Sequence, residues 1–259
     1  MMTRSRRSTG KEPFLRSIEL RRDKVPDLAK YPFSIPAIAS LSSLSLDPKV
    51  TFLVGENGSG KSTLLEGIAL ALKLNPEGGS QHFRFETQKA HSDLGDYLRL
   101  VRGIRRPRTG YFLRAESFFN VATEVDRIAR EEYQGMLTLQ AHGGKSLHEQ
   151  SHGESFLALL TNRFYADGVY ILDEPEAALS PQRQLGFLAV LHDLVTGKGC
   201  QFVIATHSPI ILAYPQATIY SLDDGAISPI DYERTSHFTL TRDFLADRSR
   251  YLRKLFEDR

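Results

Sequence analysis

The chain contains 259 residues, of which 41% are hydrophobic and 25% are charged, and its formal net charge at pH 7 is +2. This composition is that of an ordinary soluble α/β domain, and no apolar run approaches the ~18–20 residues that cross a bilayer. The single cysteine, Cys200, excludes a disulfide framework and suits a reducing compartment, so a cytoplasmic location is expected.

The N-terminal part combines a basic tail with a layer of strands. Residues 1–12 are expected to form a flexible tail, which lacks the apolar core of a secretory signal. Residues 13–259 are expected to form a single domain. Its first segment, residues 14–54, contains short alternating or apolar runs, beginning with Phe14–Leu20. We therefore predict an antiparallel strand layer at the start of the domain.

A glycine-rich loop follows the apolar run Val50–Val54 and precedes a helix-like segment, Thr63–Leu74. Strand, glycine loop and helix form the context in which a short phosphate-loop match becomes specific. Glycines let backbone N–H groups surround phosphate oxygens, and the positive end of the helix faces the same anion. The residues predicted to bind a nucleoside triphosphate are Gly55, Glu56, Asn57, Gly58, Ser59, Gly60, Lys61, Ser62 and Thr63.

Residues 81–165 are the least regular part of the chain and are predicted to form a helical insert. Residues 102–114 within it hold five arginines and no acidic residue. Such a patch can bind the nucleic-acid backbone, but it can also be a solvated face or serve a bound nucleotide. These alternatives stay open, and Arg105, Arg106 and Arg108 are the residues with which to test nucleic-acid binding.

The segment Ser151–Ser155 opens a further predicted helix. Ser151, with Glu154 three residues later, has the pattern of a capping box. A capped helix start is also an anion site. Because the phosphate loop already serves the nucleotide of its own subunit, this second site suggests the γ-phosphate of another subunit. Apolar residues recur on one side of this helix at Phe156, Leu159, Leu160 and Phe164.

A second short apolar run, Val169–Asp173, ends in two carboxylates, those of Asp173 and Glu174. A buried strand that stops at acidic residues delivers them to the carboxyl edge of a sheet, where open α/β folds bind ligands. Asp173 is the expected partner of a Mg²⁺ ion that Ser62 also binds. Lys61 is expected to reach the β- and γ-phosphates. Glu174 is expected to polarise the attacking water. The alternative is that both acids only solvate the end of the strand.

Three elements complete the chain. Pro181–Thr196 is predicted to be a helix that Gly197 ends. Gln201–Thr206 is a third apolar run, and His207 follows it directly. A histidine in that place can contact the γ-phosphate or the attacking water. The apolar residues of Leu240–Phe256 have mixed helical spacing, which predicts a terminal helix on the core.

In this order, the segments GENGSGKS, SHGES, VYILDEPEAALS and ATHSP resemble the motifs of the ATP-binding-cassette (ABC) ATPases. They correspond to that family's phosphate loop, its signature motif, its magnesium strand with catalytic glutamate and D-loop, and its switch histidine. The matches span residues 50–209. The signature departs from the commoner transporter form, LSGGQ. The resemblance implies an α/β P-loop NTPase fold with a mostly parallel central sheet flanked by helices.

The resemblance also implies ATP hydrolysis with Mg²⁺ in a head-to-tail homodimer that forms on ATP binding. Two ATP molecules would lie between each phosphate loop and the opposing signature, so Ser151 and Gly153 would bind nucleotide in trans. Ala177, Leu179 and Ser180 would line the dimer seam. The candidate catalytic residues are Lys61, Glu174 and His207.

Two parts of the family's site have no clear match. The family's glutamine loop contacts Mg²⁺, but Arg114 and Glu116 stand where its glutamine would, and Gln88 lies earlier. Glu116 is the preferred metal ligand; the alternative is that Arg114 and Glu116 pair at the surface. Tyr31 or Phe33 could stack on adenine, although packing against the sheet is the expected role of both.

The phrases ATHSPIIL and LDEPEAALSPQ resemble soluble SMC- and RecF-like ATPases of chromosome maintenance, repair and phage defence more than transporter subunits. The chain has no long heptad arms, so it is similar to small predicted AAA/ABC ATPases that consist of a compact head. We expect hydrolysis to be coupled to remodelling of DNA or a protein partner. Alternatives are the nucleotide-binding subunit of a membrane transporter and a P-loop kinase, which the signature and His207 disfavour.

Overall fold

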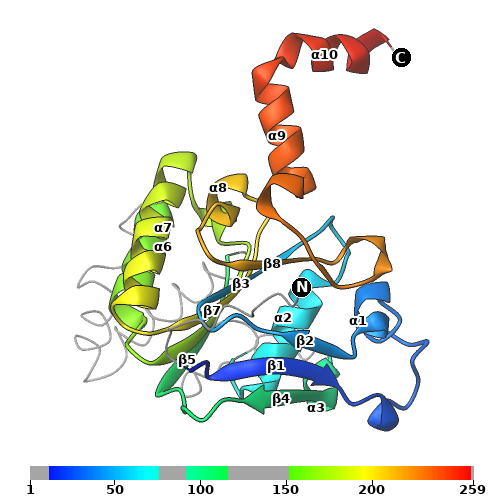
Figure 1. The fold of residues 1–259 in the computed structure, drawn as a ribbon, viewed down its shortest axis with the longest axis vertical. Coiled ribbons are helices and arrows are strands. Elements are labelled where there is room, and N and C mark those ends of the chain that lie inside the picture. Colours follow the sequence, from blue (N-terminus) through cyan, green and yellow to red (C-terminus); the bar gives the residue numbers. More distant parts are fainter. Residues whose placement is uncertain (1–11, 76–91, 116–151, 258–259) are drawn as a thin grey trace, which may run out of the picture.

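The computed structural model describes residues 12–75, 92–115 and 152–257 (Figure 1). The strands of this part are β1 (Leu15–Leu20), β2 (Ser43–Ser45), β3 (Val50–Val54), β4 (Leu98–Arg102), β5 (Thr109–Arg114), β6 (Gly168–Asp173), β7 (Gln201–Ala205), β8 (Thr218–Ser221) and β9 (Ser228–Pro229). Its helices are α1 (Pro36–Ser40), α2 (Lys61–Ala71), α3 (Leu94–Tyr97), α6 (His152–Arg163), α7 (Pro181–Thr196), α8 (Pro209–Leu212), α9 (Ser236–Ala246) and α10 (Arg248–Glu257). Short 3₁₀ turns include η3 (Pro175–Ala178), η4 (Asp223–Gly225) and η5 (Tyr232–Arg234).

The central sheet has the strand order β5-β6-β7-β3-β8-β9. Its strands from β5 to β8 run parallel, and β9 pairs with β8 in the antiparallel sense. Strands β3, β6 and β7 are buried along their whole length, as strands covered on both faces are. This arrangement confirms the predicted α/β fold with a mostly parallel sheet flanked by helices.

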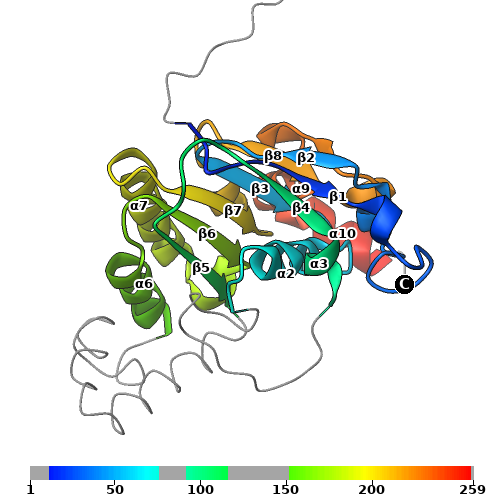
Figure 2. The ribbon, with the colours of Figure 1, turned by 90° about the horizontal axis from the view of Figure 1, so that it is seen from below.

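Helices and a second sheet cover the two faces of the central sheet (Figure 2). On one face, α2 and the strands β1, β2 and β4 enclose an apolar core. On the other face, α6, α7 and α8 enclose a second core. Because successive side chains of a strand point to opposite faces, β3 sends Leu53 into the first core and Phe52 into the second.

The second sheet is antiparallel and has the order β2-β1-β4. Its strands β1 and β2 confirm the predicted strand layer near the N-terminus. Strand β4 was not predicted, because it lies within the segment expected to form a helical insert. Its pairing with β1, in which Leu100 lies opposite Ile18, joins residues too far apart in the chain for a local pattern to indicate.

A buried glutamine joins the two sheets. The side chain of Gln201, at the start of β7, accepts hydrogen bonds from the backbone N–H groups of Phe14 and Leu15 at 3.0 and 2.9 Å. Its amide nitrogen donates to the carbonyl oxygens of Leu15 and Asp47, both at 2.8 Å. Since every polar atom of this fully buried side chain has a partner, the cost of burying it is offset.

The helices that frame the site agree closely with the sequence. Helix α7 has the predicted bounds, and Gly197 follows it. Helix α2 begins at Lys61, two residues before the predicted start, because Gly60 adopts a left-handed conformation (φ 99°) and serves as its N-cap. The predicted apolar face of α6 is fully buried at Phe156, Leu159, Leu160 and Phe164.

The prediction of a terminal helix on the core is wrong. The C-terminal residues form two helices, α9 and α10, that project from the body (Figure 1), and neither helix has a buried residue. Leu245 is 73% exposed and Phe256 is 69% exposed. Asp247, with φ −146°, interrupts the helix between them. The apolar residues are therefore divided between two short helices and cannot form one continuous face that would cover the core.

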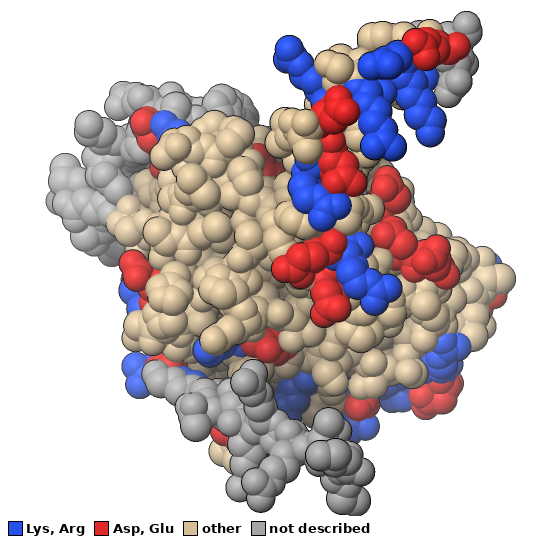
Figure 3. All heavy atoms as spheres, turned by 45° about the horizontal axis from the view of Figure 1, so that its top comes forward, with Lys and Arg blue, Asp and Glu red and all other residues tan. Residues whose placement is uncertain are grey.

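The second of the projecting helices, α10, is also basic. Figure 3 shows lysine and arginine side chains gathered on this part of the molecule. Helix α10 alone carries Arg248, Arg250, Arg253 and Lys254. No helix in the described part of the chain, α10 included, combines the length and the apolar character needed to cross a membrane.

Candidate functional site

The glycine loop between β3 and α2 has the backbone geometry that only glycine adopts easily. Gly58 and Gly60 have φ values of 81° and 99°. A Cβ atom on Gly60 would lie 2.8 Å from Cγ2 of Ile35, so both its conformation and its close packing require glycine. Asp223, the first residue of η4, supports the loop, because its Oδ1 accepts a hydrogen bond from the backbone N–H of Glu56 at 2.9 Å.

The lysine of the loop is held by the loop itself. Lys61 is only 4% exposed, and its Nζ donates to the carbonyl oxygens of Gly55 and Glu56 at 2.7 and 3.0 Å. Burial lowers the pKa of this ammonium group, and the nearby carboxylates of Glu174 and Asp173 oppose that effect. The cation is thus kept beside the loop, from which it can exchange its carbonyl partners for phosphate oxygens.

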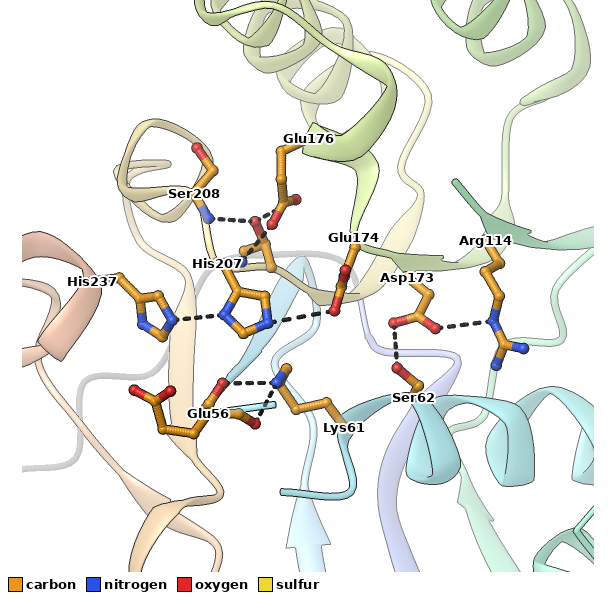
Figure 4. A network of polar contacts seen from close by, with 12 residues as sticks. Glu56, Lys61, Ser62, Arg114, Asp173, Glu174, Glu176, His207, Ser208 and His237 are labelled. Carbon is orange, nitrogen blue, oxygen red and sulfur yellow. Dashed lines mark hydrogen bonds and ion pairs between the residues drawn. The ribbon is translucent and has the colours of Figure 1, made fainter. Parts of the chain in front are cut away.

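Ser62 and Asp173 meet at the carboxyl edge of the sheet (Figure 4). The hydroxyl of Ser62 donates to Oδ1 of Asp173 at 3.1 Å. On the other side, Nε of Arg114 donates to Oδ2 of Asp173 at 3.1 Å, and its Nη2 lies 3.2 Å from Oε2 of Glu66. Asp173 is 3% exposed; burial raises the pKa of its carboxyl group, and the Arg114 guanidinium and the Ser62 hydroxyl counter that rise.

The donor set fits a magnesium ion. A hydroxyl and a buried carboxylate are hard oxygen ligands, and Mg²⁺ in nucleotide sites takes one or two such ligands and completes its shell with phosphates and water. Consistent with this sparse set, the described residues contain no cluster of three or more His, Cys, Asp or Glu residues that could hold a metal ion. Ser62 and Asp173 are the described residues that would hold it.

Arg114 does not pair at the surface, as one prediction allowed. It points inward from the end of β5 and bridges Asp173 and Glu66, with its own side chain 25% exposed. At the end of β5, the guanidinium of Arg114 therefore lies beside Asp173, the predicted metal ligand. Gln88 and Glu116, the two candidates for the glutamine itself, lie outside the described residues.

Glu174 leaves the sheet edge by a left-handed turn. Its φ and ψ are 50° and 54°, a conformation that costs a non-glycine residue about 1–2 kcal/mol. The turn is fixed by a hydrogen bond from its N–H to the carbonyl oxygen of Ala205 at 2.9 Å. As a result, its carboxylate diverges from that of Asp173 and lies with Oε1 3.4 Å from Nε2 of His207 (Figure 4).

Glu176 and Thr206 fix the position of His207. One carboxylate oxygen of Glu176 accepts from the backbone N–H of His207 at 2.5 Å, and the other accepts from Oγ1 of Thr206 at 2.7 Å. The Thr206 hydroxyl oxygen in turn accepts from the N–H of Ser208 at 3.0 Å. Glu176 belongs to the quoted DEPEAALS segment, but no spacing rule indicates that its side chain returns to the next strand.

A second histidine, His237, contacts His207. Nε2 of His237, in the first turn of α9, lies 2.8 Å from Nδ1 of His207. The sequence assigned no role to His237, because it lies 30 residues after His207 and in a segment without a motif. Only the folded chain brings the two rings together.

A hollow of about 490 Å³ lies above the glycine loop and is open to solvent. Tyr31, 67% exposed, stands at its rim, contrary to the expectation that it packs on the sheet. Phe33 is 3% exposed and packs edge-on against Tyr97, as expected. Of the two aromatic residues, Tyr31 is therefore the one available to a base. The residues that line the hollow are Tyr31, Ile35, Asn57, Gly58, Gly60, Lys61, Ser62, Thr63 and Glu174.

The signature region is described only in part. Ser151 lies outside the described residues, so the predicted capping box is not described. Gly153 starts α6, where a Cβ atom would lie 2.5 Å from Cδ of Arg183 and 3.2 Å from the carbonyl oxygen of Ala178. Arg183 also donates to Glu154 at 2.9 Å. The start of α6 is thus fastened to the segment after Glu174 in the same chain.

Of the residues predicted to line a dimer seam, Ala177 and Ser180 are exposed and available to a partner. Leu179 is 6% exposed and belongs to the second core, so its side chain offers little surface to a partner.

The arginine patch is partly occupied by the protein itself. Arg105 pairs with Asp167 and stacks over the ring of Phe14, with its guanidinium carbon 4.5 Å from the ring centroid. Arg108 lies 3.8 Å from Asp167 but stays 81% exposed, and Arg106 is exposed. Two arginines of the three are consequently open to an external ligand.

Comparison with known families agrees with this site. A family model described as "AAA domain" matches residues 36–131, which include the glycine loop. A second model, described as "AAA domain, putative AbiEii toxin, Type IV TA system", matches residues 143–213, which include Asp173, Glu174 and His207.

Similar proteins were found at the level of sequence and of fold. The "Putative ABC transporter ATP-binding protein TTE0246" of Caldanaerobacter subterraneus subsp. tengcongensis is 30% identical over 71% of this chain and 82% of that protein. The lipoprotein-releasing system ATP-binding protein LolD of Chromohalobacter salexigens is 25% identical over 74% of this chain and 86% of its own length. The SMC head domain from Thermotoga maritima aligns with a TM-score of 0.44 at 18% identity, over 84% of this chain and 99% of the domain.

The alignment with TTE0246 extends over 211 residues at 30% identity and covers 82% of that protein. The chain therefore belongs to the ATP-binding-cassette family and is an ATP-binding ATP hydrolase.

Proposed function

We propose that this ATPase hydrolyses Mg²⁺-ATP in a site completed by a second copy of the chain. The observation that carries the proposal is the convergence of Lys61, Asp173, Glu174 and His207 on one edge of the sheet beside an open hollow. A cation for the phosphates, a ligand for the metal and a candidate base are the parts that phosphoryl transfer requires.

Each of these side chains has a distinct role in the proposed reaction. Lys61 exchanges its loop carbonyls for the β- and γ-phosphate oxygens and balances their charge. Glu174, held away from Asp173 by its left-handed turn, accepts a proton from the attacking water. His207 orients that water or the γ-phosphate through Nε2. Ser62 and Asp173 would hold a Mg²⁺ ion, which would supply charge neutralisation for the phosphates.

We include a second copy because the hollow beside Lys61 and Glu174, where the γ-phosphate would lie, is open. Gly153 lies in the first turn of α6, which contacts η3 and α7 of its own chain through Ala178 and Arg183. A head-to-tail dimer would bring the signature of one subunit onto the nucleotide of the other. Because such a site is complete only in the dimer, hydrolysis would depend on the association of two subunits.

Mixing two inactive variants tests this arrangement directly. Glu174→Gln keeps the ATP contacts but lowers turnover roughly 100-fold, because it removes the base. Ser151→Arg blocks the signature. If the signature acts in trans, an equimolar mixture contains heterodimers with one intact site, and activity returns to about a quarter of the wild-type value. If the signature acts in cis, or if each subunit works alone, the mixture stays inactive.

For the output of the cycle, we favour remodelling of DNA or a protein partner. Support comes from the exposed Arg106 and Arg108, from the basic helix α10, and from the description of the model that matches residues 143–213. DNA binding by the Glu174→Gln protein with ATP should weaken as salt rises, and Arg106→Ala with Arg108→Ala should reduce that dependence. Arg105→Ala alone is the matched comparison, because Arg105 is engaged by Asp167.

The names of TTE0246 and LolD favour a second candidate, the ATP-binding subunit of a membrane transporter. Co-purification decides between the two. A membrane protein retained stoichiometrically by the Glu174→Gln variant in detergent supports the transporter subunit. Retention of nucleic acid or of a protein without membrane spans supports the remodelling function.

A further inference from the structure

The rings of His207 and His237 are in direct contact through their nitrogen atoms. The two ring nitrogens are 2.8 Å apart, and the ring centroids lie 4.9 Å apart at an interplanar angle of 60°. At this distance one imidazole must donate and the other must accept. The pair therefore has two arrangements, which place the mobile protons of both rings differently.

The chain holds His237 in place from its own side. Thr235 is fully buried and caps α9, because its Oγ1 accepts from the N–H of Phe238 at 3.4 Å and donates to the carbonyl oxygen of Tyr232 at 2.7 Å. The rest of α9 has no buried residue. The first turn of an otherwise exposed helix is thus anchored where it delivers an imidazole to the nucleotide site.

The surroundings decide which arrangement is preferred. His207 presents its buried Nε2 to the carboxylate of Glu174 at 3.4 Å; the contact is not a hydrogen bond, but the nearby negative charge favours a proton on that nitrogen. The Nδ1 atom of His207 is then an acceptor, so Nε2 of His237 must donate to it. Burial lowers the pKa of His237, and the neighbouring His207 adds to this effect, which favours the neutral ring.

We propose that His237 is a positioning residue for hydrolysis, which selects the Nε2–H tautomer of His207 by donating a hydrogen bond to its Nδ1. This inference rests on the proposed role of His207. With His207 so held, an N–H group is directed at Glu174 and at the place of the γ-phosphate. Without the donor, the ring can rotate or exchange its proton and present a bare nitrogen instead.

The remaining groups around His237 do not supply a competing partner. The charged residues that influence it are Glu56, Lys61 and Asp223, all from the glycine loop and η4, besides His207 itself. None of them makes a hydrogen bond to His237 within the described part of the chain, and its Nδ1 is buried there without a partner. The hydrogen bond to His207 is the one that fixes the orientation of the ring.

Three variants of the full-length protein test the proposal. His237→Phe keeps a flat ring and removes the donor. His237→Gln keeps a donor close to the place of Nε2. His192→Gln, on the exposed face of α7, is the matched control. Long-range ¹⁵N–¹H spectra of the imidazoles, assigned with His207→Ala and His237→Gln, report the tautomer of His207 without nucleotide, and steady-state assays report kcat and KM for ATP.

We expect the Nε2–H tautomer of His207 in the wild type, in His192→Gln and in His237→Gln. In His237→Phe we expect a mixed or inverted tautomer and a fall in kcat of about tenfold with little change in KM, as for residues that orient a functional histidine. Unchanged spectra or unchanged kcat in His237→Phe would overturn the proposal. So would an equal loss in His237→Gln, since a role in folding alone would not distinguish donor from non-donor.

His207→Ala separates this inference from the proposed function. If His207→Ala hydrolyses ATP normally, the proposed role of His207 is refuted and the inference with it. If His207→Ala is impaired while His237→Phe leaves tautomer and kcat unchanged, only the role of His237 is refuted.

Discussion

The nucleotide edge of the central sheet and the C-terminal helices α9 and α10 are built on opposite rules. At the sheet edge, polar and charged side chains are buried and hydrogen-bonded: Lys61 to a carbonyl oxygen of the glycine loop, Asp173 to Ser62, and Thr206 to Glu176. On α9 and α10, apolar side chains such as Leu245 and Phe256 are exposed, and neither helix has a buried residue. His237, at the start of α9, joins the two regions.

The difference separates a region with one fixed arrangement of side chains from a region whose side chains are free to contact other molecules. A bonded polar network inside a fold is costly unless every member has a partner, so it fixes one arrangement. Exposed apolar residues on projecting helices fix nothing and stabilise little. We infer that changes at the sheet edge act on chemistry and stability together, whereas changes on the helices act on what the helices contact.

The largest effect should come from the lysine of the glycine loop. Lys61→Met is expected to weaken ATP binding roughly 100-fold, because a hydrogen bond from a charged group contributes about 1.5–3 kcal/mol. Isothermal titration with ATP and Mg²⁺ measures the loss. Lys24→Met, at an exposed position, serves as the control. Equal affinities for the two variants would show that the loop does not bind the triphosphate.

Arg114 tests whether the network acts as a unit. Arg114→Met leaves Asp173 and Glu66 without their shared cation, so the free energy of unfolding should fall by about 2 kcal/mol. Affinity for Mg²⁺-ATP should fall as well, because the pKa of the Asp173 carboxyl rises further without the guanidinium. Urea denaturation and nucleotide titration measure these effects. Wild-type stability in Arg114→Met would mean that the ion pairs are not formed in solution.

Tyr31 should have a smaller and purely binding effect. Tyr31→Ala is expected to raise KM for ATP about fivefold, since the stacking of a ring contributes about 1 kcal/mol, and to leave kcat unchanged. Tyr31→Phe retains the ring and should behave as the wild type. If Tyr31→Ala leaves KM at the wild-type value, another group holds the base.

The smallest effect is expected on α10. Replacing Leu255 and Phe256 by serine should change the free energy of unfolding by less than about 0.5 kcal/mol, because both side chains are already exposed. The same change at Leu159 and Phe164, both fully buried on α6 or directly after it, is the contrasting control and should prevent stable folding. A large destabilisation by the α10 changes would mean that the two regions do not differ as described.

The sequence predicted the first region well because its signals are local. Strands β3, β6 and β7 are short continuous apolar runs, and the glycine loop and the acidic strand end follow them directly in the chain. The order of the motifs along the chain then placed their side chains at one edge of a parallel sheet.

What the sequence did not predict depends on contacts between distant segments. Strand β4 forms because β1 is available to pair with it, and Arg114 turns inward because Glu66 and Asp173 lie within reach. His237 lies in no motif, and the motif that contains Glu176 does not indicate where its side chain points; only the fold brings both to His207. The helices α9 and α10 have the apolar content of a core element, but local spacing does not tell whether a core lies opposite them.

The most direct test of a shared Mg²⁺-ATP site uses the Glu174→Gln variant in solution. Light scattering after size-exclusion chromatography measures its molar mass with and without Mg²⁺-ATP. We predict the mass of one chain without nucleotide and of two chains with it, and a return to one chain when Ser151→Arg is added to the same protein. A single-chain mass under saturating Mg²⁺-ATP would contradict the account.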